Sequence, residues 1–120
     1  MLDGYNCPPD LLNDANKIYE FLDQMPEKLG MKKLTKPYIV KAVGNDKKDP
    51  GGWTGFVIIE ESHISVHTFV KRGFITIDAY SCKHFDSDMA ATYIKDFFQV
   101  KEAEIQVEVR GKKYPSENIY

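Results

Sequence analysis

Hydrophobic and polar residues alternate in the middle of the chain in a way that is typical of paired β-strands. The run is wholly apolar over residues 56–59, breaks at the polar segment 60–63 and returns to alternation over 64–68. A turn-forming segment at 71–73 then leads into a second alternating run over 74–82. A period of two places every second side chain on the same face of a strand. The pattern therefore predicts a long β-hairpin.

Two other segments carry the period of an amphipathic helix. The first follows Pro8-Pro9-Asp10, a typical helix start, and we expect this helix to end at Pro26. The second follows Asp86-Ser87-Asp88, whose side chains can cap the free N–H groups of a first helical turn. Short alternating runs over 38–42 and 104–110 predict two more strands.

These elements predict a two-layer α+β sandwich. Its sheet is mainly antiparallel, because clean alternation after Ser62 indicates one buried face, and the two helices cover that face. The polar, glycine-rich segment 44–52 is an exposed loop in this arrangement. The other face of the sheet has no predicted cover. We therefore expect a homodimer or higher assembly that forms through or beside the open sheet.

Length and composition narrow the class of protein. With 120 residues and an ordinary globular composition, we expect a single domain over 1–120. The net charge of −2 gives no electrostatic reason to expect a nucleic acid or membrane partner. The longest apolar run stops at Glu60, far short of a membrane helix, and the N-terminus lacks the pattern of a secretion signal. Cys7 and Cys82 are too few for a disulfide framework, which favours a reducing, cytoplasmic location.

The predicted hairpin gathers more reactive side chains than a structural hairpin needs. One face of its second strand is polar and ends at Cys82, and the first strand carries Ser62 and His67. The odd spacing of Ser62 and His67 puts their side chains on opposite faces of a regular strand. A bulge or turn near Ser62 would be needed for the two to act together.

Three interpretations of these residues compete. A metal site made of His63, His67, Cys82 and His84 lacks the paired-cysteine spacing of zinc sites, and we expect no metal. A Ser–His or Cys–His nucleophile pair lacks the flanking glycine motif of a nucleophile elbow. In the third interpretation Ser62 and His63 only cap a tight turn. Residue types alone favour this third interpretation.

The order of residues in the hairpin favours a different interpretation. The segment Glu60–Thr68 has the sequence EESHISVHT, and Gly73-Phe74, Asp78 and Ser81-Cys82 follow it. This pattern resembles the prokaryotic S-adenosylmethionine decarboxylases, small pyruvoyl-dependent lyases of spermidine and polyamine biosynthesis. The resemblance is strongest over 54–82 and stays collinear over most of the remaining chain. It implies a cytoplasmic, dimeric enzyme that is made as a zymogen.

The resemblance implies autocatalytic cleavage of the backbone at the Glu61–Ser62 bond. The Ser62 hydroxyl attacks the Glu61 carbonyl and converts the amide to an ester. Elimination and hydrolysis then leave a covalent pyruvoyl group in place of Ser62. The mature enzyme consists of the fragments 1–61 and 62–120.

The resemblance also gives roles to residues around the cleavage site. His67 matches the family histidine that assists cleavage. Thr54 stands where the family usually has a serine whose hydroxyl supports the tetrahedral intermediate. In the mature enzyme the pyruvoyl ketone forms a Schiff base with the substrate amine and accepts the electrons released with CO₂. Cys82 matches the general acid that returns a proton to the substrate carbon.

Substrate contacts are expected from Trp53 and Phe69, whose rings can stack on a purine, and from Glu60. The chain departs from the family where Phe69-Val70-Lys71 replaces Trp-Pro-Glu and where Lys83 replaces glycine. Both lysines repel a sulfonium if they face the site. S-adenosylmethionine is the first expected substrate. The alternatives are another amino acid, such as arginine or ornithine, and an unprocessed relative that acts only as an interaction protein.

Overall fold

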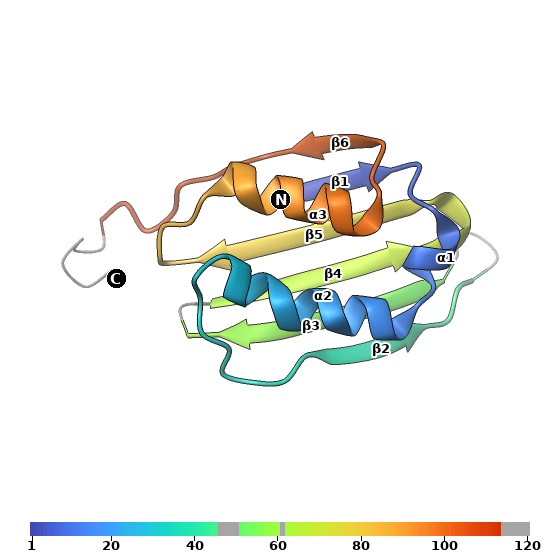
Figure 1. The fold of residues 1–120 in the computed structure, drawn as a ribbon, viewed down its shortest axis with the longest axis horizontal. Helices are drawn as coiled ribbons and strands as arrows, with labels where there is room; N and C mark the ends of the chain where they lie inside the picture. The colour runs from blue at the N-terminus through green and yellow to red at the C-terminus, as the bar shows by residue number, and fades with distance from the viewer. Residues whose placement is uncertain (46–50, 61, 114–120) are drawn as a thin grey trace.

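The structure, a computed structural model, describes residues 1–45, 51–60 and 62–113. Six strands form one antiparallel sheet in the order β2-β3-β4-β5-β1-β6, and helices pack on it (Figure 1). The strands are β1 (Leu2–Tyr5), β2 (Tyr38–Ala42), β3 (Gly52–Ile59), β4 (Ser62–Phe69), β5 (Phe74–Ser81) and β6 (Glu102–Ile105). The helices are α1 (Pro9–Leu12), α2 (Ala15–Lys28) and α3 (Ser87–Phe98), and a short 3-10 turn, η1 (Val70–Arg72), joins β4 to β5.

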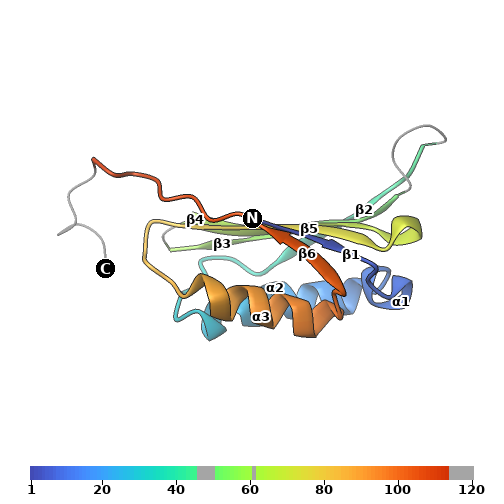
Figure 2. The same ribbon diagram turned by 90° about the horizontal axis from the view of Figure 1, so that it is seen from above.

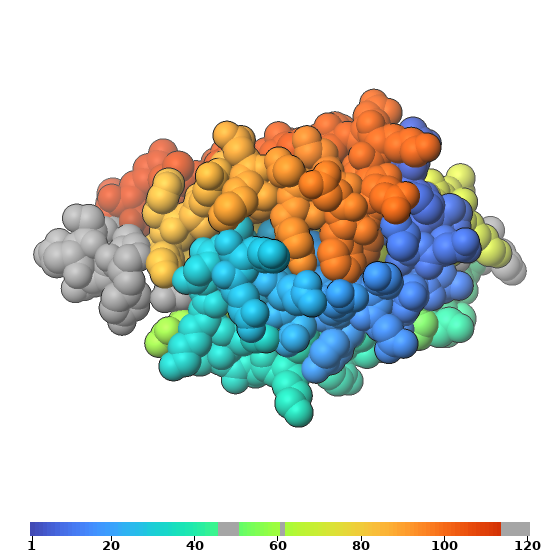
Figure 3. All heavy atoms as spheres, in the orientation of Figure 1, coloured from blue at the N-terminus to red at the C-terminus, as the bar shows by residue number. Residues whose placement is uncertain are grey.

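The sheet and the helices form two layers. Helices α2 and α3 lie side by side on one face of the sheet, and no helix of the described residues covers the opposite face (Figure 2). On the helical side, the side chains of α2 and α3 close over the sheet (Figure 3). Fully buried residues between the layers include Phe21, Leu22, Met25, Val57, Ile64, Val66, Ile75, Ile77 and Phe98. The predicted two-layer α+β fold is confirmed.

The N-terminal helical segment is divided into two helices, where the sequence pattern predicted one. Helix α1 ends at Leu12, and α2 begins at Ala15. The Asp14 carboxylate caps α2, because it accepts hydrogen bonds from the backbone N–H groups of Asn16 (3.0 Å) and Lys17 (3.2 Å). The cap starts a new helix axis after α1 and lets α2 lie along the sheet.

The expectation that Pro26 ends the helix is wrong. Helix α2 continues through Pro26 to Lys28. Pro26 is buried, and its carbonyl accepts a hydrogen bond from the N–H of Met31 (2.8 Å). These contacts hold the last turn, although proline cannot donate to the preceding turn. Among the described helices, none is long and apolar enough to cross a bilayer.

Strands β1 and β6, at one side of the sheet, differ from the strands that the sequence pattern predicts. The pattern did not predict β1, which is only four residues long and inserts between β5 and β6. The strand predicted over 104–110 is wrong in extent, because β6 covers Glu102–Ile105. Next to the paired residues of β1 and β6, Met1 and Gln106 exchange two backbone hydrogen bonds of 2.9 Å. Beyond that point Val107 and Val109 are 64% and 70% exposed.

The loop predicted over 44–52 is only partly described. Its first two residues are exposed, residues 46–50 lie outside the described part of the chain, and Gly51 and Gly52 are buried. Gly52 is already the first residue of β3, so Trp53 is a strand residue. The end of the predicted loop is therefore part of the sheet.

Gly52 lies so close to β4 that no side chain fits there. A Cβ at this position would lie 1.8 Å from the carbonyl oxygen of Thr68. We expect Gly52→Ala to lower the free energy of unfolding by about 3 kcal/mol or more in urea titrations. Gly30→Ala is the control, because nothing lies within 4 Å of the added Cβ and only its positive φ of 71° is strained. That strain costs about 1 kcal/mol. Equal losses in the two variants would contradict this packing.

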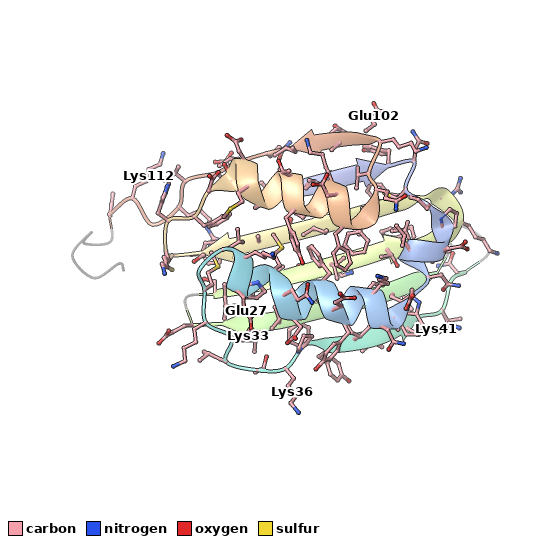
Figure 4. All side chains as sticks on the ribbon, viewed as in Figure 1. Glu27, Lys33, Lys36, Lys41, Glu102 and Lys112 are labelled. Atoms are coloured by element: carbon pink, nitrogen blue, oxygen red, sulfur yellow. The ribbon has the colours of Figure 1, made fainter. Side chains whose placement is uncertain are left out.

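An ion pair fixes the connector that follows α2. Lys33 Nζ lies 2.6 Å from the Asp23 carboxylate and 3.4 Å from that of Glu27 (Figure 4). The hydrogen bond to Asp23 raises the pKa of Lys33. Beside this pair, the backbone N–H of Glu60 donates to the carbonyl of Lys32 (2.9 Å). The connector thereby holds the end of β3, immediately before the β3–β4 turn.

Candidate active site

Three side chains meet where β4 begins and β5 ends. Ser62 is the first residue of β4 and pairs with Ser81 of β5. Ser62 Oγ lies 4.0 Å from Cys82 Sγ, and the Tyr80 hydroxyl lies 3.7 Å from the same sulfur. Cys82 is exposed, and Ser62 and Tyr80 are half-buried. We call Ser62, Tyr80 and Cys82 the thiol cluster.

Arg110 adds a positive charge to the thiol cluster. Its guanidinium carbon lies 4.0 Å from the centroid of the Tyr80 ring, which is a cation–π distance. The hydrogen bond to Cys82 raises the pKa of Tyr80, and the charge of Arg110 opposes that rise. Because the net shift is upward, the Tyr80 hydroxyl keeps its proton at neutral pH. It can therefore donate a hydrogen bond to the sulfur.

The two cysteines differ in their surroundings. Cys7 is 3% exposed, and burial raises the pKa of its thiol to about 11. Cys82 is exposed and lies beside two hydroxyl groups. Both thiols are free. Of the two, Cys82 is placed to exchange a proton with a ligand.

A second group of side chains lies at the other end of β4. Thr54 of β3 and His67 of β4 are cross-strand partners, and Thr54 Oγ1 lies 3.1 Å from His67 Nδ1. Phe69 shares the face of His67, and its ring centroid lies 5.3 Å from that of Phe74. A polar pair thus lies next to an aromatic pair on the open face of the sheet. We call Thr54 and His67 the histidine cluster.

The thiol cluster and the histidine cluster do not meet within one chain. Ser62 and His67 are five residues apart on β4, and every residue between them is paired with β3 or β5. At the ordinary rise of a strand, their Cα atoms are separated by about 16 Å. The bulge that would bring Ser62 and His67 together is therefore absent from β4.

Other residues predicted to be in the site lie apart from these clusters. Trp53 packs against the core on the helical side of the sheet, where its Nε1 donates to Asn13 Oδ1 (3.2 Å). Glu60 is an exposed residue of the turn before β4. Glu61 lies outside the described residues. Of the three predicted substrate contacts, Phe69 lies beside the histidine cluster, Glu60 precedes the thiol cluster by two residues, and Trp53 is on the helical side of the sheet.

The two lysines that replace family residues have different positions. Lys83 follows Cys82, but its ammonium donates to the carbonyl of Gly30 (2.9 Å), at the end of the helical layer. Lys71 is an exposed residue of η1, at the end of the hairpin that carries the histidine cluster. The Lys83 ammonium is therefore fixed just after the end of α2, whereas Lys71 lies next to the aromatic pair.

The sequence pattern did not single out Tyr80 or Arg110. Tyr80 precedes Cys82 by two residues, a spacing that puts both on one face of a strand and could have identified it. Arg110 follows the last strand and carries no such signal. Within 1–45, 51–60 and 62–113, no three histidine, cysteine or carboxylate side chains are grouped to hold a metal ion.

Comparison with known proteins identifies the class to which this fold and site belong. The sequence profile of the S-adenosylmethionine decarboxylase family matches residues 1–111. The S-adenosylmethionine decarboxylase proenzyme of Pyrococcus horikoshii is 34% identical over 112 residues, which cover 92% of this chain and 76% of the relative. The proenzyme of Clostridium botulinum strain Loch Maree is also 34% identical, over 113 residues that cover 93% of this chain and 91% of the relative.

A solved structure has the same fold. The crystal structure of the adenosylmethionine decarboxylase from Aquifex aeolicus matches with a TM-score of 0.73 and 28% identity, over 92% of this chain and 86% of that one. The fold and the relatives together define a decarboxylase. The chain belongs to the S-adenosylmethionine decarboxylase family, which confirms the resemblance in the segment 54–82.

Proposed function

We propose that this protein is a self-processing decarboxylase of S-adenosylmethionine that cleaves its own Glu61–Ser62 bond. The observation that carries the proposal is the contact of Ser62 with Cys82 at the start of β4, in a chain of this family. Ser62 supplies the hydroxyl for the backbone rearrangement, and Cys82 supplies a proton to the product. The pyruvoyl group formed from Ser62 supplies an electron sink for decarboxylation.

The fold supports a cut at this position. The cut immediately precedes β4, and both β3 and β4 are internal to the sheet, so each keeps a hydrogen-bonded neighbour on its other side. Ser62 stays paired with Ser81 of β5, and the end of β3 stays held through the Glu60–Lys32 hydrogen bond. The residue that bears the new terminal group therefore remains beside Cys82 after cleavage. Residues 62–69 need no rearrangement to present that group.

Cys82 is suited to hold and return a proton. The exposure of Cys82 leaves its thiol open to a bound substrate. The hydroxyl of Tyr80 lies within hydrogen-bonding distance of the sulfur in either protonation state. Because both thiols are free, a reducing compartment such as the cytoplasm suits the chain.

We infer that the histidine cluster acts on the thiol cluster of a second copy. Ser62 and His67 lie about 16 Å apart on one strand, too far for contact. A two-fold axis through the open faces, near Ser65, would place each thiol cluster opposite the partner's His67. Thr54 would come with His67, because their side chains are bonded. The homodimer predicted from the uncovered sheet face would then also complete two equivalent sites.

The open face has the apolar surface that such a dimer needs. Tyr38, Phe56 and Ile58 lie on it and are 60%, 41% and 40% exposed in the single chain. Contiguous apolar surface of this kind marks an interaction site in soluble proteins. Two such sheets packed face to face would form four layers, with helices on the outside.

The aromatic pair beside the histidine cluster supports a purine-containing substrate. Phe69 and Phe74 present ring faces next to His67 on the open side of the sheet. A stacked purine gains about 1–3 kcal/mol per ring contact. In the inferred dimer this pair would flank the partner's Cys82.

Release of CO₂ from labelled substrates tests the proposed activity. We expect purified protein to release label from carboxyl-labelled S-adenosylmethionine and not from arginine, ornithine or lysine. Release from an amino acid alone would contradict the proposed substrate and leave the decarboxylase chemistry standing. No release from any of the four by cleaved protein would contradict the proposed activity.

A further inference from the structure

We propose that Tyr80, held by Arg110, is a positioning residue that stabilises the Cys82 thiolate left when the thiol gives up its proton. The inference rests on the proposed function, since it gives Tyr80 and Arg110 a part in the proton transfer assigned to Cys82. It concerns the chain's own side chains and can be tested without turnover. Neither residue is a candidate from the sequence pattern.

The hydroxyl of Tyr80 contacts the sulfur of Cys82. Oη and Sγ lie 3.7 Å apart, and in the thiol form either group can donate. Once the sulfur has lost its proton it can only accept, so the hydroxyl must be the donor. A hydrogen bond to a charged acceptor is stronger than one to a neutral acceptor. The contact therefore favours the thiolate over the thiol.

Two neighbouring side chains contact the Tyr80 ring. Tyr80 is in the last regular part of β5 and pairs with His63 of β4. The ring of His63 lies 5.7 Å from that of Tyr80, and the guanidinium of Arg110 lies 4.0 Å from it. The Tyr80 ring is thus contacted by His63 and by the exposed Arg110, and the cation–π contact favours the ring position in which the hydroxyl lies beside Cys82.

The positive charge of Arg110 also favours the Cys82 thiolate. Arg110 contributes a permanent positive charge to a site where a negative charge forms on Cys82. The upward shift in the pKa of Tyr80, whose largest cause is the contact with Cys82, keeps the phenol available as the donor. Both residues therefore act in the same direction on the sulfur. Loss of either should leave less thiolate at a given pH.

The position of Arg110 depends on the end of the sheet. Gln106 is bonded to Met1, and four residues later Arg110 lies over the ring of Tyr80, near the end of β5. Lys112, two residues after Arg110, lies on the same segment (Figure 4). Lys112 is exposed and provides a control for the loss of one positive charge nearby.

Alkylation of Cys82 by iodoacetamide tests the proposal. The reagent reacts with the thiolate, and the burial of Cys7 leaves Cys82 as the accessible thiol in the folded protein. The alkylation rate is measured against pH by mass spectrometry, in the full-length protein and again with Ser62→Ala. The second background keeps every chain uncleaved, so the result does not depend on processing or turnover.

We expect Tyr80→Phe to slow alkylation at neutral pH roughly three- to tenfold, the range of one partly exposed hydrogen bond, and to displace the pH profile upward. Arg110→Gln should slow it in the same direction, with Arg110→Lys in between, because lysine keeps the charge without the planar contact. Tyr19→Phe on α2 and Lys112→Gln are the matched controls, and their alkylation rates should equal that of the parent protein. Thermal unfolding of each variant checks that it folds.

An unchanged or faster rate in folded Tyr80→Phe would overturn the proposal. An equal effect of Lys112→Gln and Arg110→Gln would overturn the part assigned to Arg110, because it would show only a general effect of charge. Failure of the proposed function has a different signature, namely an intact Glu61–Ser62 bond or no CO₂ release with the alkylation differences still present. The two failures are therefore distinguishable.

Discussion

Ser62→Ala is expected to abolish CO₂ release from S-adenosylmethionine completely. Alanine has no hydroxyl to attack the preceding carbonyl, so neither the cut nor the pyruvoyl group can form. Without that group the protein has no electron sink for decarboxylation. The effect is a loss to background in an assay with carboxyl-labelled substrate, because no second residue can replace Ser62.

Ser65→Ala is the matched control for this loss. Ser65 is a half-buried serine on the same strand, three residues from Ser62, and it pairs with Phe56 and Asp78. We expect the Ser65→Ala protein to be cleaved and active. Equal loss in both variants would show that β4 tolerates no change, and activity in Ser62→Ala would contradict the role of Ser62.

Co-expression of a Ser62→Ala chain with a His67→Ala chain is expected to restore cleavage that neither chain shows alone. In a mixed dimer the intact Ser62 of one chain lies opposite the intact His67 of the other. His67→Ala alone should slow cleavage about 10²- to 10⁴-fold, the usual contribution of a general base. In the mixture, up to about half of the His67→Ala chains should be cut, the share that random pairing puts in mixed dimers.

Affinity tags of different mass on the two chains make the result readable on a denaturing gel. Only the His67→Ala chain should be cut, because the other lacks Ser62. His84→Ala, in an exposed histidine outside both clusters, should cleave without help. Mixed dimers without cleavage would contradict a shared site, and rapid cleavage of His67→Ala alone would contradict the role of His67.

The period-two pattern of the hairpin was enough to predict the central strands. Apolar residues at every second position of β4 and β5, such as Ile64, Val66, Ile75 and Ile77, are all buried. Since only one face of the sheet is covered, the alternation is clear and the register follows from it. The order of residues from Glu60 to Cys82 indicated the family. Hydrophobic alternation alone could not have indicated it.

Other features depended on contacts that a local pattern does not encode. The cap made by Asp14 divides a segment whose apolar spacing is continuous. Strand β1 is too short to show a period, and β6 ends at Ile105, inside the alternating run of the sequence. Arg110 contacts the ring of Tyr80, although the two residues are 30 positions apart in the sequence. The distance between Ser62 and His67 could be established only from the observed pairing of β4.

The mass of the purified, denatured wild-type protein tests self-cleavage most directly. We predict two fragments in equal amounts, residues 1–61 and residues 62–120 with a pyruvoyl group in place of Ser62, and one uncut chain for Ser62→Ala. A single uncut chain of 120 residues in the wild-type protein under all conditions would contradict self-cleavage at Glu61–Ser62.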